Sequence, residues 1–253
     1  MLSRRRFLQM CGVSLAAMAV GVPVVAAAGS IPVLLYHRIG DSDDKITAKT
    51  QRFVEDLDFL QKQGFNTISL KQFDQAVSGK RDQLPENPVL ITFDDGYADN
   101  YEHAFPELQK RGMTAAFFII SDFVGQAERV TWPQIQEMKK YGMGIGSHTL
   151  SHRFLNELPE KEAILEVEKS KFHIENWLGS PVRFIAFPGG FYTPPILEAV
   201  KSAGYCGAFS VHYGLYQEGD VPYTIKRIPV FAKDQPIWYI LAKRGLLPQI
   251  LPV

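Results

Sequence analysis

The sequence predicts an α/β protein in which helices cover a parallel sheet, and three observations support this fold class. First, an amphipathic segment, a helix-stopping glycine and a short apolar segment follow one another four times. Second, the apolar segments are short and rich in β-branched and aromatic residues, as buried strands are. Third, no linker, low-complexity tract or block of like charges divides residues 29–253, so they can share one core.

The predicted elements follow one another at short intervals. The strands cover residues 32–36, 66–70, 89–93, 114–120, 143–146, 183–187, 206–211 and 223–230. The four helices that end in glycine cover residues 53–63, 101–111, 132–141 and 196–203. A glycine after the last helical turn readily adopts the left-handed conformation that ends a helix. The longest helix is expected at residues 160–178, before a Gly-Ser-Pro stop, and these units are enough to close a barrel.

Residues 92–96 read Thr-Phe-Asp-Asp-Gly and place two carboxylates, Asp94 and Asp95, directly after a predicted strand. Barrels and open α/β sheets carry catalytic groups at this carboxyl end of their strands. Because side chains alternate along a strand, the two carboxylates point in different directions. One can therefore bind a metal while the other faces a bound water. By itself, an Asp-Asp-Gly sequence is also typical of an ordinary turn.

A second polar motif, His-Thr-Leu-Ser-His, places His148 and His152 after the predicted strand at residues 143–146. Two histidines at this spacing share one face if the segment is helical, although such a pair also occurs on surfaces by chance. One carboxylate and two imidazoles suit a divalent metal, and a second carboxylate can move protons. The two motifs together favour a hydrolase that activates water with a metal.

Both motifs resemble the first two motifs of the polysaccharide deacetylase family, also called the NodB-homology domain or carbohydrate esterase family 4. The segment FIAFPGGFY at residues 184–192 resembles the F-A-Y-P-Y-G form of the third motif, which is typical of poly-N-acetylglucosamine deacetylases. The resemblance covers residues 31–231 and implies the NodB-homology fold, a distorted (β/α) barrel of about seven strands. It also implies metal-dependent removal of N-acetyl groups from an N-acetylglucosamine-containing polysaccharide, such as an exopolysaccharide, peptidoglycan or a chitin-like polymer, with release of acetate.

The resemblance assigns the metal to Asp95, His148 and His152, and the role of general base to Asp94. Zinc is the expected ion, because two histidines, a carboxylate and an open position form a hydrolytic zinc site. Co²⁺, Ni²⁺ and iron also suit these ligands. As water attacks the acetyl carbonyl an oxyanion develops, and a backbone N–H near residues 189–191 is expected to stabilise it.

An amine leaving group needs a proton from a general acid, and two histidines are candidates. His37 ends the first predicted strand, and His212 follows the strand at residues 206–211. Most of the family takes this acid from a late motif, which would correspond to His212. The branch with the F-A-Y-P-Y-G motif takes it from an early Tyr-His pair, so the sequence Tyr36-His37 favours His37.

Residues next to the motifs are expected to line the substrate site. They are Tyr97, Phe187, Pro188, Gly189 and Tyr192. Aromatic rings beside a site can stack on sugars, and they can equally belong to the core.

One position departs from the family pattern. Most members carry an arginine at the start of the third motif, where it orients the catalytic aspartate, and this chain has Ala186. Arg183 is a poor substitute, because residues three apart on a strand point to opposite faces. Either Asp94 is oriented in another way or activity is modest. The same departure occurs in the branch that acts on poly-β-1,6-N-acetylglucosamine, so it also bears on the expected substrate.

The sequence leaves other functions open. The same site could serve a carbohydrate O-acetyl esterase or a small-molecule amidase, or the chain could be a weakly active glycan-binding component of an exopolysaccharide system. The 27 basic and 27 acidic residues give no net charge. This balance gives no indication of nucleic-acid binding and suits a neutral polymer better than a polyanion.

Residues 1–28 are expected to be an export signal rather than part of the fold. Residues 3–9 resemble a twin-arginine signal, and an apolar stretch at residues 13–25 precedes an Ala-Ala-Ala cleavage site. The stretch is too short for a good membrane span, and an uncleaved N-terminal anchor is the alternative. The single deacetylase domain, residues 29–253, would then act in the periplasm or outside the cell. Its expected partners are the twin-arginine export machinery and exopolysaccharide export components.

Overall fold

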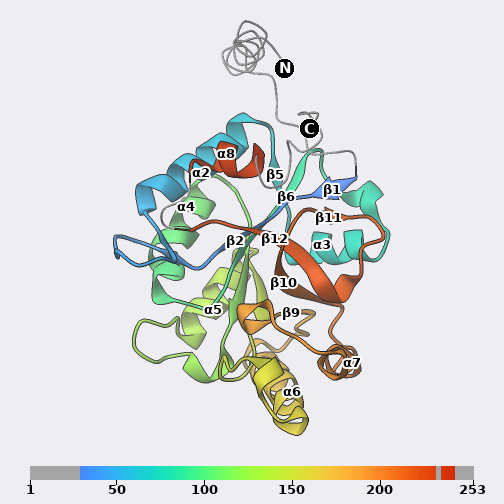
Figure 1. The fold of residues 1–253 in the computed structure, drawn as a ribbon. Helices are drawn as coiled ribbons and strands as arrows, with labels where there is room; N and C mark the ends of the chain where they lie inside the picture. Colours follow the sequence, from blue (N-terminus) through green and yellow to red (C-terminus); the bar gives the residue numbers. More distant parts are fainter. Residues whose placement is uncertain (1–28, 232–234, 243–253) are drawn as a thin grey trace, which may run out of the picture.

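The computed structural model describes residues 29–231 and 235–242, and seven parallel strands form a closed barrel at its centre (Figure 1). Around the barrel the strand order is β2-β12-β10-β9-β8-β7-β6, and β6 pairs with β2 to close the ring. The seven strands are β2 (Val33–Tyr36), β6 (Pro88–Phe93), β7 (Ala116–Ile119), β8 (Gly144–Ser147), β9 (Phe184–Ala186), β10 (Gly207–Tyr213) and β12 (Ile225–Pro229). This arrangement confirms the predicted fold class.

The predicted strand at residues 66–70 is not part of this ring. Its counterpart β5 (Asn66–Thr67) is short and pairs with the start of β6. The reason is local, because Ser69 and Gln72 form a capping box that starts helix α3 (Leu70–Val77). The short pairs β1 (Ser30–Ile31) with β11 (Tyr216–Gln217), and β3 (Arg38–Ile39) with β4 (Thr47–Ala48), also lie outside the ring.

Helices cover the outside of the barrel (Figure 1). They are α2 (Thr50–Lys62), α4 (Phe105–Lys110), α5 (Trp132–Lys140), α6 (Glu160–Leu178), α7 (Pro194–Ser202) and α8 (Ile237–Leu241). Each helix predicted from the sequence is present, and α6 has the predicted bounds with Gly179 in the left-handed conformation at its end. The helix predicted at residues 101–111 begins with a π-helical turn, Asn100–Ala104. No helix in the described ranges is long and apolar enough to cross a membrane.

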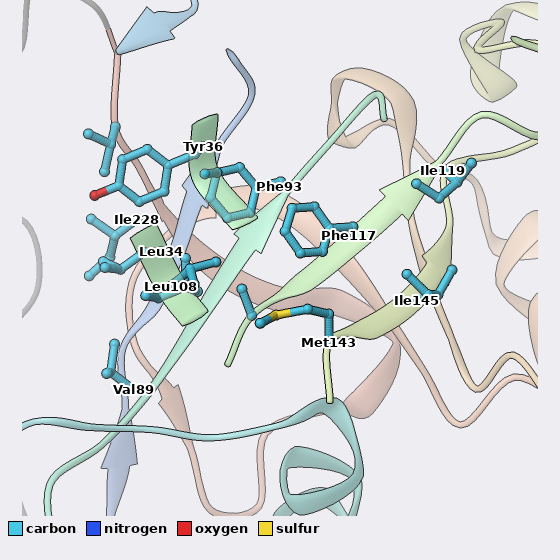
Figure 2. Close-up of a cluster of buried hydrophobic side chains, with 14 of the residues drawn as sticks. Leu34, Tyr36, Val89, Phe93, Leu108, Phe117, Ile119, Met143, Ile145 and Ile228 are labelled. Carbon is cyan, nitrogen blue, oxygen red and sulfur yellow. The ribbon is translucent and has the colours of Figure 1, made fainter. Parts of the chain in front are cut away.

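Two apolar clusters account for the core. The larger one fills the space between the barrel and the helices, where Phe93 and Phe117 stack at 4.8 Å between ring centroids (Figure 2). The other cluster contains the strand residues that alternate with those of the first cluster, so it fills the barrel interior. Helix α3 inserts Leu70 and Phe73 into this interior cluster from the end where the strands begin.

Strand β8 carries no side chains at two interior positions, which makes room for this packing. A Cβ at Gly144 would lie 2.8 Å from Leu70, and a Cβ at Gly146 would lie 2.4 Å from Phe118. The barrel is therefore filled at its amino end, and polar side chains gather at the opposite end, where the strands stop.

Candidate active site and metal centre

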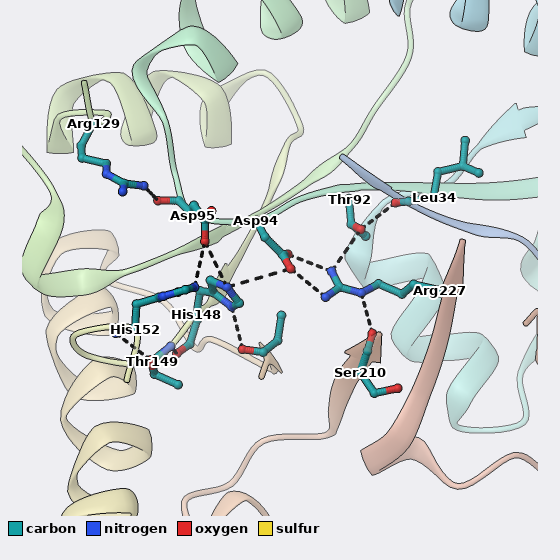
Figure 3. Close-up of polar contacts among 12 residues, drawn as sticks. Leu34, Thr92, Asp94, Asp95, Arg129, His148, Thr149, His152, Ser210 and Arg227 are labelled. Atoms are coloured by element: carbon teal, nitrogen blue, oxygen red, sulfur yellow. Dashed lines mark hydrogen bonds and ion pairs between the residues drawn. The ribbon is translucent and has the colours of Figure 1, made fainter. Parts of the chain in front are cut away.

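The two predicted motifs meet at the carboxyl end of the barrel, where Asp95, His148 and His152 converge (Figure 3). Asp95 Oδ1 lies 3.2 Å from His148 Nε2 and 3.2 Å from His152 Nε2. Ligand atoms at zinc bond lengths of about 2.1 Å in a tetrahedron lie roughly 3.4 Å apart, so the three atoms have the spacing of metal ligands.

The hydrogen bonds around the cluster also fit a cation. His148 Nδ1 lies 2.8 Å from the carbonyl oxygen of Ala186. A carbonyl can only accept, so Nδ1 carries the proton and the lone pair of Nε2 faces Asp95. Asp95 Oδ1 is buried and makes no hydrogen bond within the described part of the chain. A divalent metal would neutralise these facing lone pairs, so the residues present fit such an ion.

The backbone is strained within both motifs. Asp95, Thr149 and His152 have positive φ angles of 74°, 66° and 63°, a conformation that costs energy for residues other than glycine and is often found at functional sites. The segment from His148 to His152 is therefore not helical, and a turn brings the imidazoles together with ring centroids 5.0 Å apart. His148 and His152 would share one face of a helix only if this segment were helical, so that expectation is not met.

Neighbouring side chains hold the strained loops. Arg129 donates a hydrogen bond of 2.8 Å from its guanidinium to the carbonyl oxygen of Asp95. In the histidine loop, Ser151 donates to the carboxylate of Glu166 from both its backbone N–H and its hydroxyl. These bonds come from residues distant in sequence, so tertiary structure stabilises both turns.

Asp94 is held by an arginine that the sequence reasoning missed. Arg227 on β12 donates two hydrogen bonds to Asp94, to Oδ1 at 2.8 Å and to Oδ2 at 2.7 Å, and both side chains are buried. The Nε of Arg227 also donates to the carbonyl of Ser210 at 2.9 Å. Arg227 thus provides the orientation that the resemblance expects from the position of Ala186, whose small side chain belongs to the interior cluster.

Arg227 also determines the charge state of Asp94. Burial alone would raise the pKa of Asp94, but the charge of Arg227 and its hydrogen bonds outweigh burial and lower this pKa. Asp94 is therefore ionised at neutral pH and can accept a proton. A weak signal for Arg227 exists in the sequence, because Lys226 and Arg227 are adjacent in a strand and side chains alternate, so one of the two must point inward and find a partner there.

The two candidate acids occupy different places. Burial lowers the pKa of His37, and the carboxylates of Asp94 and Asp95 partly oppose this effect, so His37 lies within range of both charges. Its Nδ1 is buried without a hydrogen-bond partner in the described ranges. His212 is exposed at the end of β10, with its ring 6.2 Å from that of Tyr192. The role of His37 as general acid stays a prediction, and its position next to both carboxylates supports it.

The residues predicted to line the substrate site differ in how far they are exposed. Phe187 has no exposed surface and packs 5.3 Å from Tyr192, so its ring belongs to the core and the expected stacking on sugar does not fit. Pro188 is buried, whereas Gly189 is exposed with a φ of 61°. Tyr192 is half-buried.

Tyr97, also half-buried, lies between two guanidinium groups close to Asp95. The guanidinium carbon of Arg129 is 4.0 Å from the centre of its ring, and that of Arg38 is 4.5 Å away. Contacts of this kind are cation–π interactions, and they fix the ring at the edge of the site.

The backbone N–H groups of residues 189–191 differ in whether they already have a hydrogen-bond acceptor. The N–H of Gly190 donates to the carbonyl of Phe187 at 2.8 Å, and the N–H of Phe191 donates to the carbonyl of Pro188 at 3.3 Å. The N–H groups of Gly190 and Phe191 therefore already have acceptors. Among residues 189–191, the N–H of Gly189 is the first candidate for the oxyanion donor.

Comparison with known proteins agrees with this geometry. Residues 81–208 match the family model described as polysaccharide deacetylase. The chain is 32% identical over 201 residues to YxkH of Bacillus subtilis, covering 79% of this chain and 71% of that protein. It is 26% identical over 191 residues to poly-β-1,6-N-acetyl-D-glucosamine N-deacetylases of Staphylococcus aureus, covering 70% of this chain and 65% of theirs.

Two solved structures show the same fold. The deacetylase PplD of Streptococcus pyogenes, determined in complex with acetate, has a TM-score of 0.78 and 25% identity, covering 85% of this chain and 97% of that one. IcaB from Ammonifex degensii has a TM-score of 0.77 and 29% identity, covering 85% of this chain and 96% of that one.

Proposed function

Because this chain belongs to the polysaccharide deacetylase family, we propose that it removes N-acetyl groups from an N-acetylglucosamine-containing polysaccharide and releases acetate. The observation that carries the proposal is the ionised Asp94, fixed by Arg227, beside the cluster of Asp95, His148 and His152. The Staphylococcus aureus relatives named as poly-β-1,6-N-acetyl-D-glucosamine N-deacetylases support an amino-sugar polymer as the substrate.

The side chains divide the chemistry between them. A divalent metal on Asp95, His148 and His152, which we propose to be zinc, would lower the pKa of a bound water and polarise the acetyl carbonyl. Asp94 accepts the proton of the attacking water, and the two bonds from Arg227 keep its carboxylate from rotating away. The low pKa of Asp94 keeps it free to accept that proton.

Breakdown of the tetrahedral intermediate requires protonation of the amine. We assign this step to His37, whose burial makes its protonated imidazole a stronger acid than a histidine in water. The backbone N–H of Gly189 is the proposed donor to the developing oxyanion.

The test is acetate release by the purified domain from N-acetylglucosamine oligomers with β-1,4 and β-1,6 linkages. Chelation should abolish release, and added Zn²⁺ should restore it. Asp94→Asn should lower kcat at least about a hundredfold, because a general base contributes that much. Asp58→Asn, at an exposed carboxylate of α2, is the matched control. Release that survives both the chelator and Asp94→Asn would contradict the proposed mechanism.

The position of Arg227 argues against the alternative that the chain is a weakly active glycan-binding component. That idea depended on the alanine at position 186, and the structure gives Asp94 a bidentate partner from another strand. An esterase would be recognised by adding an O-acetylated oligosaccharide to this assay, because acetate release from the ester would exceed release from the amide and would survive His37→Ala.

We further propose export through the twin-arginine pathway to the periplasm or the cell exterior. The support is the sequence of residues 1–28, which lie outside the described residues. Residues 1–28 fused to a folded reporter should carry it out of the cytoplasm, and replacing Arg4 and Arg5 by lysine should retain it there. Export of the doubly substituted fusion would contradict the pathway.

A further inference from the structure

We propose that Phe154 and Phe191 form a stacking platform for a pyranose ring of the polysaccharide, adjacent to the sugar that loses its acetyl group. The inference rests on the proposed function and deepens it, because it says how the chain recognises a polymer rather than a single sugar. In the following, the two rings together are called the aromatic platform.

The aromatic platform lies directly beside the metal-ligating cluster. The ring of Phe154 is 6.5 Å from the imidazole of His152 and 5.4 Å from the ring of Phe191, with an angle of 69° between the two phenyl planes. The two residues come from different loops, one after β8 and one after β9, which the barrel brings together. Edge-to-face contact fixes one ring against the other.

Both rings are exposed although an apolar core is close by. Phe154 is 39% exposed and Phe191 is 47% exposed. By contrast, Phe187 in the same third-motif segment is fully buried. Exposed phenylalanines that touch each other at a reaction site are better explained by a ligand than by packing.

The backbone next to the aromatic platform is shaped to admit the two rings. Gly189 has a φ of 61°, and a Cβ on it would lie 2.8 Å from Phe191 and 3.1 Å from Phe154. A side chain at this position would therefore displace both rings. The two phenylalanines can therefore occupy these positions because Gly189 has no side chain.

The charge around the aromatic platform indicates a neutral ligand. Arg153, the neighbour of Phe154, forms an ion pair of 2.8 Å with Glu162. This charge is thus balanced locally. A pyranose offers a neutral apolar face of C–H groups, which suits an aromatic ring, and hydroxyl groups at its edge, which stay in water.

The experiment compares oligomers of different length. Phe154→Ala and Phe191→Ala should each raise KM for a β-1,6-linked N-acetylglucosamine tetramer about three- to tenfold, with a smaller change in kcat. The increase should be smaller for N-acetylglucosamine itself, which cannot occupy two positions. Phe154→Tyr and Phe191→Tyr, which keep the ring, should restore most of the affinity.

Phe172→Ala is the matched control, because Phe172 is 63% exposed on α6 and packs beside His173 rather than at the site. It should leave KM unchanged for both substrates. Equal effects of the platform variants on the monomer and the tetramer, or no effect on either, would overturn the proposal.

Binding measured without turnover separates this proposal from the proposed function. Calorimetric titration of the tetramer into Asp94→Asn, with and without Phe154→Ala, reports on the aromatic platform alone. Weaker binding by the doubly substituted protein supports the platform even if the wild-type protein releases no acetate. Equal binding by the two proteins overturns the platform even if the wild-type enzyme is active.

Discussion

Asp94 and Arg227 form a fully buried ion pair, and its strength depends on geometry. Two parallel hydrogen bonds match the guanidinium fork to the carboxylate, which a lysine cannot reproduce. A buried pair of this kind contributes little net stability, but removal of one partner leaves an uncompensated charge. Substitutions of Arg227 therefore affect catalysis and stability in different ways.

We predict that Arg227→Lys lowers kcat about 10- to 100-fold with little change in KM, since it keeps the charge but frees the Asp94 carboxylate to rotate. Arg227→Met should lower the free energy of unfolding by about 3–5 kcal/mol, measured by denaturant titration. Combining it with Asp94→Leu should recover most of that loss, because no buried charge then remains.

The exposed ion pair of Lys201 and Glu198 is the control for this comparison. Lys201→Met should change the free energy of unfolding by less than about 1 kcal/mol. If Arg227→Met lowers the free energy of unfolding no more than Lys201→Met does, loss of Arg227 does not leave an uncompensated buried charge.

Among the elements, the π-helical turn Asn100–Ala104 connects the two halves of the reaction site. Asn100 donates a hydrogen bond of 2.8 Å from its side chain to the carbonyl of His37. The preceding Asp99 accepts from the backbone N–H of Ile39 and from Arg38. The turn follows the segment that carries Asp94, so it fixes the candidate acid relative to the candidate base.

We expect Asn100→Ala to lower kcat for amide substrates about tenfold, with a smaller effect on KM, because the segment that carries His37 loses its anchor. Ester substrates, whose leaving group needs no strong acid, should be affected less. Asn66→Ala is a suitable control, since Asn66 also donates to a backbone carbonyl but lies at the surface, in β5. An equal loss of amide and ester turnover would argue against a role through His37.

How far the sequence predicted these elements depends on whether their signals are local. Helix α6 and its Gly179 stop were predicted because the apolar pattern and the cap lie within the helix itself. The strand predicted at residues 66–70 was too long, because the capping box of Ser69 competes with the strand and wins. The turn that contains His152 could not be predicted, because its conformation depends on bonds to Glu166 on α6.

At the scale of the whole molecule, the closed barrel explains why the candidate site was only partly predictable. Asp94 and Asp95 follow β6, whereas His148 and His152 follow β8, and only β7 lies between these strands in the ring, so their convergence follows from the fold class. Arg227 comes from a distant part of the chain and has no motif around it. Its pairing with Asp94 depends on the closure of the ring through β2, which a sequence pattern does not show.

The metal is expected to stabilise the whole domain, because it binds a site that the unfolded chain lacks. At a free metal concentration about a hundred times the Kd, the gain is about 2.7 kcal/mol. For a domain of this size this corresponds to a rise in Tm of about 5–10 °C, which calorimetry with and without chelator can measure. Asp95→Asn should remove most of the dependence of Tm on metal, and an unchanged dependence would exclude Asp95 as a ligand.

Helix α3 closes the end of the barrel where the strands begin, and side chains fill the interior behind it. Within the described ranges, the metal-ligating cluster can therefore be approached from the opposite end only. A polysaccharide cannot thread through the molecule and must lie across that end, so a sugar in the middle of a long chain is as accessible as a terminal one. Acetate formed in the site has to leave by the same end, because the interior behind the cluster is filled.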